Sequence, residues 1–185
     1  MSEHYSEVGA VNASLKEISL SNNIQIRACQ QFDEQKVRDL VNKNIASFEE
    51  SQTILSAMYR RLGALYQTYA EPGCYLLIAS ESTSPSEPIG LVGIGPLHGL
   101  DFAEKIGEIR DLVVADHLRG KGIGKDLLRR CIEYAKDLGY RRLYLETSPS
   151  MTVAQKLFVR TGFKPVKEKT DTQKGIASYF IMESL

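Results

Sequence analysis

A glycine-rich turn between an apolar strand and an amphipathic helix constrains this chain more than any other feature. Residues 119–124 read Arg-Gly-Lys-Gly-Ile-Gly. The glycines let the backbone approach a ligand closely and direct several N–H groups toward one point. A helix that begins there adds a partial positive charge and unpaired donors, and Arg119, Lys121 and Lys125 add full positive charges. The turn therefore predicts a pyrophosphate-binding site.

Two common phosphate-binding loops do not fit this turn. A P-loop requires Gly-Lys followed by Ser or Thr, whereas Asp126 follows Gly124 and Lys125. A dinucleotide-binding fingerprint requires a third glycine three residues after the second. Counted from Gly120 and Gly122, that position holds Lys125. The turn is therefore a phosphate site of another kind.

The residues on both sides of the turn predict strands and helices in a definite order. Residues 106–114 are rich in β-branched side chains, which is typical of a strand. Apolar residues recur at helical spacing over 123–138, and Gly139 is placed to end that helix. Three further elements follow: a strand at 142–147, a short helix that ends near Gly162, and a strand at 163–166.

This order, the motif Arg-Gly-x-Gly-Ile-Gly after Leu112-Val113-Val114, and the pair Gly162-Phe163 closely resemble the core of the GNAT superfamily of N-acetyltransferases. The resemblance is specific over residues 106–166 and covers the remaining chain by pattern. It implies an α/β (α+β) GNAT fold, with a mixed central sheet of about six to seven strands flanked by about four helices.

A chain of 185 residues fits one domain with a sizeable core, expected here over residues 24–185. Residues 1–23 are polar and weakly patterned, and we expect a mobile N-terminal extension there. The elements expected before the turn are strands at 24–28, 74–80 and 89–94, helices at 33–48 and 51–69, and loops at 82–88 and 95–105. A last strand is expected at 177–182.

Composition narrows the possible partners. Acidic and basic residues number 23 each, so no bulk field attracts nucleic acid or an anionic membrane. No apolar run reaches the length of a transmembrane helix, and the N-terminus lacks a secretory pattern. The three cysteines are widely spaced, and neither they nor the three histidines show metal-ligand spacing. We therefore expect reduced thiols, a cytoplasmic setting and no metal.

The resemblance implies that acetyl-CoA is the co-substrate. Its pantetheine arm would pair with the main chain of Leu112, Val113 and Val114, and a backbone N–H near Val113 would polarise the thioester carbonyl. The pyrophosphate would lie on Arg119, Gly120, Lys121, Gly122, Ile123, Gly124 and Lys125. Arg129 or Arg130 could reach the adenosine 3′-phosphate, and a solvated helix face explains these two arginines equally well.

The acceptor is expected to be a primary amine of a small molecule or a protein. A lysine-like amine has a pKa of roughly 10.4, so a base must remove its proton. The resemblance makes Glu108 the candidate general base, with Asp111 and Glu146 as alternatives. Strict strand alternation would place Glu108 on one face with Arg110 and Val114, and Asp111 on the other.

One position departs from the family pattern. Many members carry a tyrosine as general acid before Gly-Phe, and here that position is Phe158; an asparagine usual at the start of the same helix is replaced by Met151. A thiol has a pKa of about 8.5, so the leaving thiolate needs little protonation. Water or Tyr144 could supply that proton.

The sequence therefore predicts an acetyl-CoA-dependent N-acetyltransferase, and the alternative is a catalytically weak acyl-CoA-binding sensor with the same fold. In this fold the acceptor pocket is usually shaped by the early helices and their loops, here about residues 47–69 and 95–105. Tyr59, Tyr66 and Tyr69 could line it or belong to the core. Either a monomer or a homodimer is compatible with the sequence.

Overall fold

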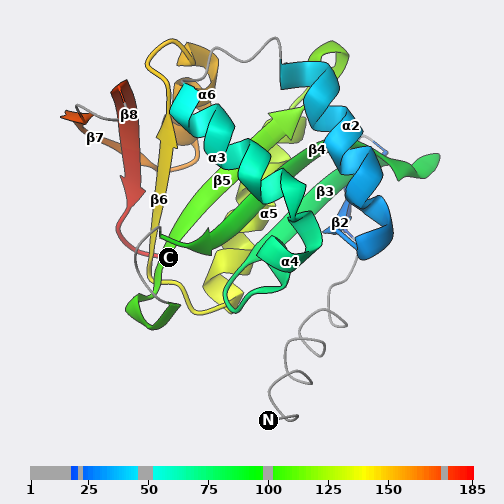
Figure 1. Ribbon diagram of the computed structural model, residues 1–185, viewed down its shortest axis with the longest axis horizontal. Helices are drawn as coiled ribbons and strands as arrows, with labels where there is room; N and C mark the ends of the chain where they lie inside the picture. The colour runs from blue at the N-terminus through cyan, green and yellow to red at the C-terminus, as the bar shows by residue number, and fades with distance from the viewer. Residues whose placement is uncertain (1–17, 21–22, 46–51, 98–101, 172–174) are drawn as a thin grey trace.

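The computed structural model describes residues 18–20, 23–45, 52–97, 102–171 and 175–185. They form a mixed β-sheet with helices on both faces (Figure 1). The order of the strands in the sheet is β1-β2-β3-β4-β5-β6-β8-β7, and every neighbouring pair is antiparallel except β5 and β6. The strands are β1 (Ile18–Leu20), β2 (Ile24–Ala28), β3 (Tyr75–Glu81), β4 (Ser84–Pro96), β5 (Ile106–Val114), β6 (Arg142–Thr147), β7 (Lys164–Asp171) and β8 (Gly175–Met182).

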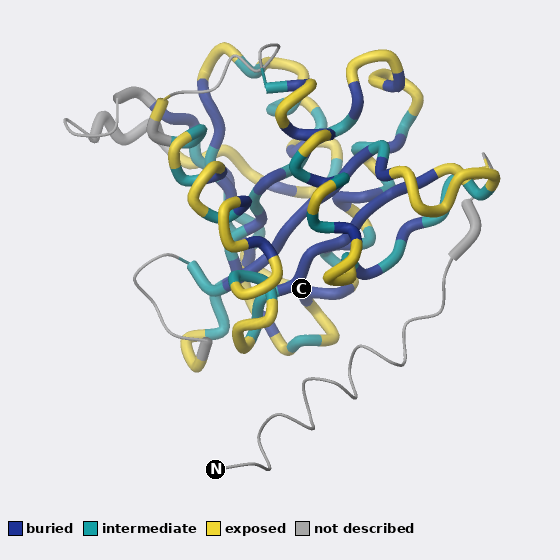
Figure 2. Tube along the Cα trace, turned by 45° about the vertical axis from the view of Figure 1, so that its right-hand side comes forward, coloured by how far each residue is buried: buried dark blue, intermediate teal, exposed yellow. Residues whose placement is uncertain are grey.

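Helices α2, α3 and α4 cover one face of the sheet, and α5 and α6 lie on the other (Figure 1). Their bounds are α2 (Glu34–Asn44), α3 (Gln52–Gly63), α4 (Leu65–Ala70), α5 (Ile123–Asp137) and α6 (Thr152–Arg160). Both faces of the sheet are packed with apolar side chains: Val37 and Val41 of α2 and Leu127 and Leu128 of α5 are fully buried and belong to one hydrophobic cluster. Figure 2 shows the central strands enclosed between the two helical layers.

The α/β architecture agrees with the expectation, and the described residues add some detail. The sheet has eight strands rather than six to seven, because Ile18–Leu20 pairs with β2 as a short edge strand. The other residues of the expected extension, 1–17 and 21–22, lie outside the described residues. The helix expected at 51–69 is two helices, since the backbone leaves the helical region at Ala64 (φ −129°, ψ 51°).

Strands β5 and β6 lie side by side only where they begin. Their parallel pairing consists of Ile106 with Arg142, Gly107 with Leu143 and Glu108 with Tyr144. Beyond Glu108 the two strands diverge, as Figure 1 shows. Backbone N–H and C=O groups on this edge of β5 therefore have no ladder partner in β6 from Ile109 onward.

A β-bulge interrupts β5 at Asp111. The pairing with β4 slips by one residue there, and Asp111 has a φ of 57°, in the left-handed region. Arg110 and Asp111 consequently lie on the same face, against side chains of α3 and α4. The strict alternation that separated Asp111 from Glu108 and Arg110 is therefore wrong. The grouping of Val114 with Glu108 is wrong for the same reason, because the extra residue reverses the phase of the strand.

Candidate active site

The glycine-rich turn leads from η4 (Asp116–Leu118) into α5. Gly120 and Gly122 have φ values of 78° and 91°, a region that residues with a Cβ seldom adopt. Gly122 is the N-cap of α5, and no side chain caps it. The N–H groups of the first helical turn, beginning at Ile123, therefore point out of the helix end, where an anion can accept them.

Basic side chains surround this helix end. Arg119 donates from Nε to the carbonyl oxygen of Val114 at 3.2 Å, and its Nη2 lies 2.6 Å from Oδ1 of Asp116. These contacts tie the turn to the end of β5. Lys121 and Lys125 are exposed beside it. The turn thus combines backbone donors, a helix N-terminus and three cations at one end of β5.

The two arginines that could reach the adenosine 3′-phosphate, Arg129 and Arg130, have different surroundings. Arg129 is exposed on α5, whereas Arg130 already contacts a carboxylate, with its Nη1 2.9 Å from Oε2 of Glu133. A salt bridge between residues three apart on one helix face is an ordinary surface feature. The two alternatives given for these arginines both remain predictions.

The edge of β5 from Ile109 to Val114, which does not pair with β6 and is called the released edge below, leads to this turn. Leu112 and Val114 are half-buried, and Val113 is buried. Because β6 diverges after Glu108, main-chain groups along this stretch of β5 have no ladder partner in β6 and can pair with an extended ligand, as an added strand would. The carbonyl oxygen of Val114 also accepts from Arg119. The predicted pantetheine residues therefore lead into the predicted pyrophosphate residues, with only Ala115 and η4 between them.

Glu108 lies at the point where the two strands separate. Its backbone pairs with that of Tyr144 on β6, and its Oε2 lies 3.7 Å from Nη1 of Arg110. The Tyr144 ring packs against Tyr179, with ring centroids 5.8 Å apart. Burial, followed by the nearby charge of Glu146, raises the pKa of Tyr144, so its hydroxyl stays protonated near neutral pH. A carboxylate and a hydroxyl thus face one region, where the sheet opens.

Asp111 belongs to a buried hydrogen-bonded cluster. Arg61 of α3 donates to both of its oxygens, from Nε at 2.7 Å and from Nη2 at 2.6 Å, and the hydroxyl of Tyr69 donates at 2.6 Å. Burial, and then the charge of Asp111, raises the pKa of Tyr69 well above its ordinary value, so the hydroxyl remains a donor. These three donors occupy both carboxylate oxygens, and this arrangement makes Asp111 a structural anchor for α3 and α4 rather than a free base.

Two glycines of β4 make room for this cluster. A Cβ at Gly93 would lie 2.1 Å from the hydroxyl oxygen of Tyr69, and a Cβ at Gly95 would lie 2.3 Å from Nη2 of Arg110. Arg110 also lies over the Tyr69 ring, 5.4 Å from its centroid. Sequence reasoning missed this layer of side chains, although the glycines inside an apolar strand were the available signal.

The position usually held by a catalytic tyrosine has no polar atom in this chain. Phe158 is buried and packs edge-on against Phe163 and Phe180, with centroids 6.4 Å and 5.6 Å away. Met151, at the N-cap of α6, makes no side-chain cap hydrogen bond. Neither residue can donate or accept a proton.

The cysteines are thiols rather than thiolates. Burial raises the pKa of Cys29 and of Cys131 to about 12, and it also raises the pKa of Cys74 despite the nearby Arg110. None of the three forms a disulfide. A nucleophilic cysteine is therefore disfavoured at each of these positions.

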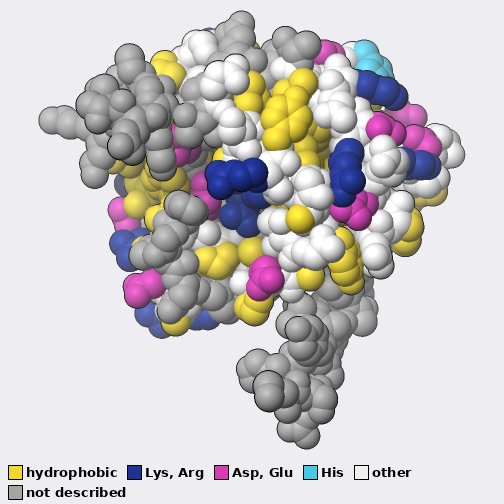
Figure 3. Space-filling model, viewed as in Figure 1, with side chains coloured by type: hydrophobic (Ala, Val, Ile, Leu, Met, Phe, Trp, Pro, Cys, Tyr) yellow, Lys and Arg dark blue, Asp and Glu magenta, His cyan; other side chains and the backbone are white. Residues whose placement is uncertain are grey.

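The expected acceptor region is described only in part, because residues 46–51 and 98–101 lie outside the described residues. Tyr69 is in contact with Asp111 and Arg110, whereas Tyr59 and Tyr66 are exposed. Figure 3 shows basic, acidic and apolar side chains intermingled on the face that carries α2, α3 and α4. An acceptor that bound on this face would be near both acidic and basic side chains.

Replacing Tyr69 with phenylalanine tests the anchor. The change removes one hydrogen bond to a buried carboxylate and keeps the ring beneath Arg110, so we expect a loss of about 1.5–3 kcal/mol in the free energy of unfolding. Chemical denaturation measures it. The matched control is Tyr66→Phe on the same helix, which is exposed and should change stability by less than about 0.5 kcal/mol. Equal losses in the two variants would contradict the anchor.

Within the described part of the chain, no three His, Cys, Asp or Glu side chains gather in a way that could hold a metal ion. No helix in that part is long and apolar enough to cross a membrane.

Comparison with known proteins assigns this arrangement to a family. Residues 38–163 match the acetyltransferase (GNAT) family. Over 106 residues the chain is 34% identical to the uncharacterized N-acetyltransferase YjgM of Escherichia coli (strain K12), covering 57% of this chain and 60% of that protein. Over 91 residues it is 33% identical to N-acetyltransferase 8B of Homo sapiens, covering 49% of this chain and 38% of that protein. The matches thus span about two fifths to three fifths of these relatives.

A solved structure gives the same fold over nearly the whole chain. It is that of yncA from Salmonella typhimurium with its cofactor acetyl-CoA. The TM-score is 0.69 at 18% sequence identity, and the match covers 88% of this chain and 94% of that one. The fold expected from the sequence is thereby confirmed.

Proposed function

Because this chain belongs to the acetyltransferase (GNAT) family, we propose that it transfers an acetyl group from acetyl-CoA to a primary amine of a small molecule or a protein. The observation that carries the proposal is the released edge of β5, which runs from Glu108 to the glycine-rich turn at the N-terminus of α5. An extended arm with a pyrophosphate at its end is the ligand that this pairing edge and this anion site fit together.

In this proposal, residues 112–114 and residues 119–125 bind different parts of acetyl-CoA. Main-chain groups of Leu112, Val113 and Val114 pair with the pantetheine arm, and an N–H near Val113 donates to the thioester carbonyl oxygen. The pyrophosphate accepts hydrogen bonds from the first turn of α5 and faces the side chains around the turn. The residues assigned to this second contact are Arg119, Gly120, Lys121, Gly122, Ile123, Gly124 and Lys125.

Glu108 acts as the general base. It removes a proton from the acceptor ammonium, directly or through one water, so that the neutral amine attacks the thioester carbon. Its place at the divergence of β5 and β6 supports this role, because the thioester end of an arm lying along β5 reaches the same region. Tyr144, whose hydroxyl stays protonated, is the nearest candidate to donate a proton to the leaving thiolate.

A specific observation favours the alternative, a catalytically weak acyl-CoA-binding sensor. Phe158 stands where many relatives place the acid, and it is buried among other aromatic rings. A sensor would bind acetyl-CoA and release no thiol with any amine. The cytoplasmic setting, supported by the three free cysteines, and the state of monomer or homodimer remain proposals under either function.

Calorimetry with acetyl-CoA, followed by a thiol-release assay over a panel of amines, tests the proposal. We expect saturable binding of acetyl-CoA and release of free CoA thiol with at least one amine. Binding without thiol release on any amine would favour the sensor. No binding of acetyl-CoA would contradict both functions.

A further inference from the structure

The guanidinium of Arg110 is partly buried and has no strong hydrogen bond. Its side chain is 14% exposed, and its Nε–H is shielded from solvent and has no acceptor among the described residues. Nη2 lies 3.5 Å from the sulfur of Cys74, a weak acceptor, and Nη1 lies 3.7 Å from Oε2 of Glu108, beyond hydrogen-bond distance. A buried cation normally has its donors satisfied, so this site is incomplete as it stands.

The neighbouring Arg61 has the close contact with a carboxylate that Arg110 lacks. Its Nε and Nη2 both donate to Asp111, in the two-pronged geometry that arginine forms with a carboxylate. The same carboxylate also accepts from Tyr69, so it has no second prong to offer Arg110. Two guanidinium groups thus lie on the same face of the sheet: Arg61 is hydrogen-bonded to a carboxylate, whereas the nearest carboxylate to Arg110, that of Glu108, lies 3.7 Å away.

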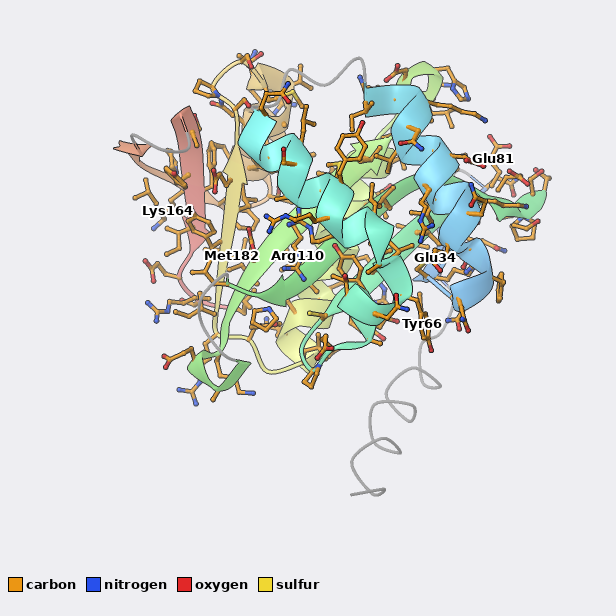
Figure 4. All side chains as sticks on the ribbon, viewed as in Figure 1. Glu34, Tyr66, Glu81, Arg110, Lys164 and Met182 are labelled. Carbon is orange, nitrogen blue, oxygen red and sulfur yellow. The ribbon has the colours of Figure 1, made fainter. Side chains whose placement is uncertain are left out.

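The chain also gives up stability to place Arg110 there. Glycine inside a strand weakens it, and Gly95 leaves the space that the guanidinium occupies. Figure 4 shows Arg110 reaching out from β5 on the face that α3 crosses. Glu108, two residues away on the same strand face, lies at the opening between β5 and β6.

From these contacts we propose that Arg110 binds a carboxylate of the acceptor, so that the acceptor is a free amino acid rather than a simple amine. The inference rests on the proposed acetyl transfer and names its acceptor class. The amino acid's ammonium faces Glu108, and its α-carboxylate accepts hydrogen bonds from the Nη1 end of Arg110, the end that lies nearest Glu108.

The charges of Glu108 and Arg110 and the short distance between them support a free amino acid as the acceptor. Once Glu108 faces an ammonium, Arg110 loses its nearest carboxylate, and a zwitterionic acceptor restores a partner to each group. The separation of 3.7 Å between the charged atoms of Glu108 and Arg110 is small enough for one α-amino acid to span the pair with both of its charged groups. An amine without a carboxylate would leave Arg110 without a carboxylate at hydrogen-bond distance.

The test compares amino acids with their amides, which differ only in the carboxylate. Alanine, serine, methionine and phenylalanine are each paired with the corresponding amide, and thiol release from acetyl-CoA is measured at equal concentrations of free amine. We expect kcat/KM for the preferred amino acid to exceed that for its amide by about a hundredfold, as for a lost partner of a buried charge. Spermidine and a lysine-containing peptide serve as acceptors without this α-amino acid arrangement.

Three variants assign the preference to Arg110. Arg110→Met removes the charge, and Gly95→Ala keeps the charge but displaces the guanidinium, whose end is free to move. Both should lower the ratio of acid to amide to within about threefold of unity, while calorimetry shows an unchanged affinity for acetyl-CoA. Arg110→Lys should recover part of the ratio, because a point charge replaces the two-pronged donor.

The outcomes separate this inference from the proposed function. Equal rates with acids and amides, acetylation only of spermidine or the peptide, or a ratio unchanged in both Arg110→Met and Gly95→Ala would overturn the carboxylate site and leave acetyl transfer standing. If no amine caused the release of CoA thiol, the proposed acetyl transfer would be contradicted, and so would the proposal that the acceptor is an amino acid.

Discussion

The variant Gly122→Val should bind acetyl-CoA about tenfold to a hundredfold more weakly than the unchanged chain and still fold. Gly122 has a φ of 91°, where a β-branched residue is strained by about 1–3 kcal/mol. Relief of that strain turns the backbone of the helix N-cap, and the N–H groups of the first turn of α5 then no longer converge on the pyrophosphate. Calorimetry with acetyl-CoA measures the loss, and circular dichroism checks the fold.

The same helix supplies a matched control. Gly139, just past the other end of α5, has a φ of 83°, so Gly139→Val introduces comparable strain about 22 Å along the helix from the turn. We expect both variants to lose stability to a similar extent and only Gly122→Val to lose affinity. A Gly122→Val protein with intact circular dichroism and unchanged affinity would refute the anion site.

Much of the order of elements follows from local sequence. The apolar period of α5, the β-branched run of β5 and the glycines between them each report on a few neighbouring residues, and the structure has a strand, a turn and a helix there. The split of the helix expected at 51–69 into α3 and α4 was not predicted, because a single glycine such as Gly63 is tolerated inside a helical pattern and does not by itself mark a break.

The arrangement around Glu108 depends on long-range contacts, and for that reason the sequence could not give it in full. The bulge at Asp111 is invisible to a two-residue period, yet it puts Asp111 on the face of Arg110. The partner that occupies Asp111 is Arg61, fifty residues earlier in the chain. A carboxylate that looked like an alternative base thus has its oxygens taken by residues that only the tertiary fold brings near.

The divergence of β5 and β6 is a second such feature. The sequence predicts both strands, but it does not show how many of their residues pair. Only three residue pairs form, and the last of them contains Glu108. The proposed donor site and the proposed base therefore meet because the parallel ladder stops there.

Replacing Glu108 with glutamine should reduce kcat/KM by about 10²–10⁴-fold, the usual contribution of a positioned base, while the affinity for acetyl-CoA stays the same. The amide is close in size to the carboxylate and cannot accept a proton. The unchanged enzyme should reach a given rate at a lower pH than the variant, because its carboxylate removes the proton from the acceptor ammonium. Stopped assays of thiol release across pH measure both effects.

The pH profile separates loss of a base from loss of structure. Without Glu108 the reaction depends on acceptor that is already neutral, and this fraction grows about tenfold per pH unit below the pKa of the acceptor amine. The rate of Glu108→Gln should therefore climb with that slope and approach the unchanged enzyme at high pH. A misfolded variant would show a uniformly low rate instead.

Glu146→Gln is the matched control, since Glu146 lies on β6 and was the other open candidate. We expect it to keep both the rate and the pH profile of the unchanged enzyme. If Glu146→Gln shows the steep rise of rate with pH and Glu108→Gln keeps the profile of the unchanged enzyme, the base belongs on β6, and the acceptor amine must approach from that strand. If neither variant changes the profile, a water chain without a carboxylate removes the proton, and Glu108 serves only as the neighbour of Arg110.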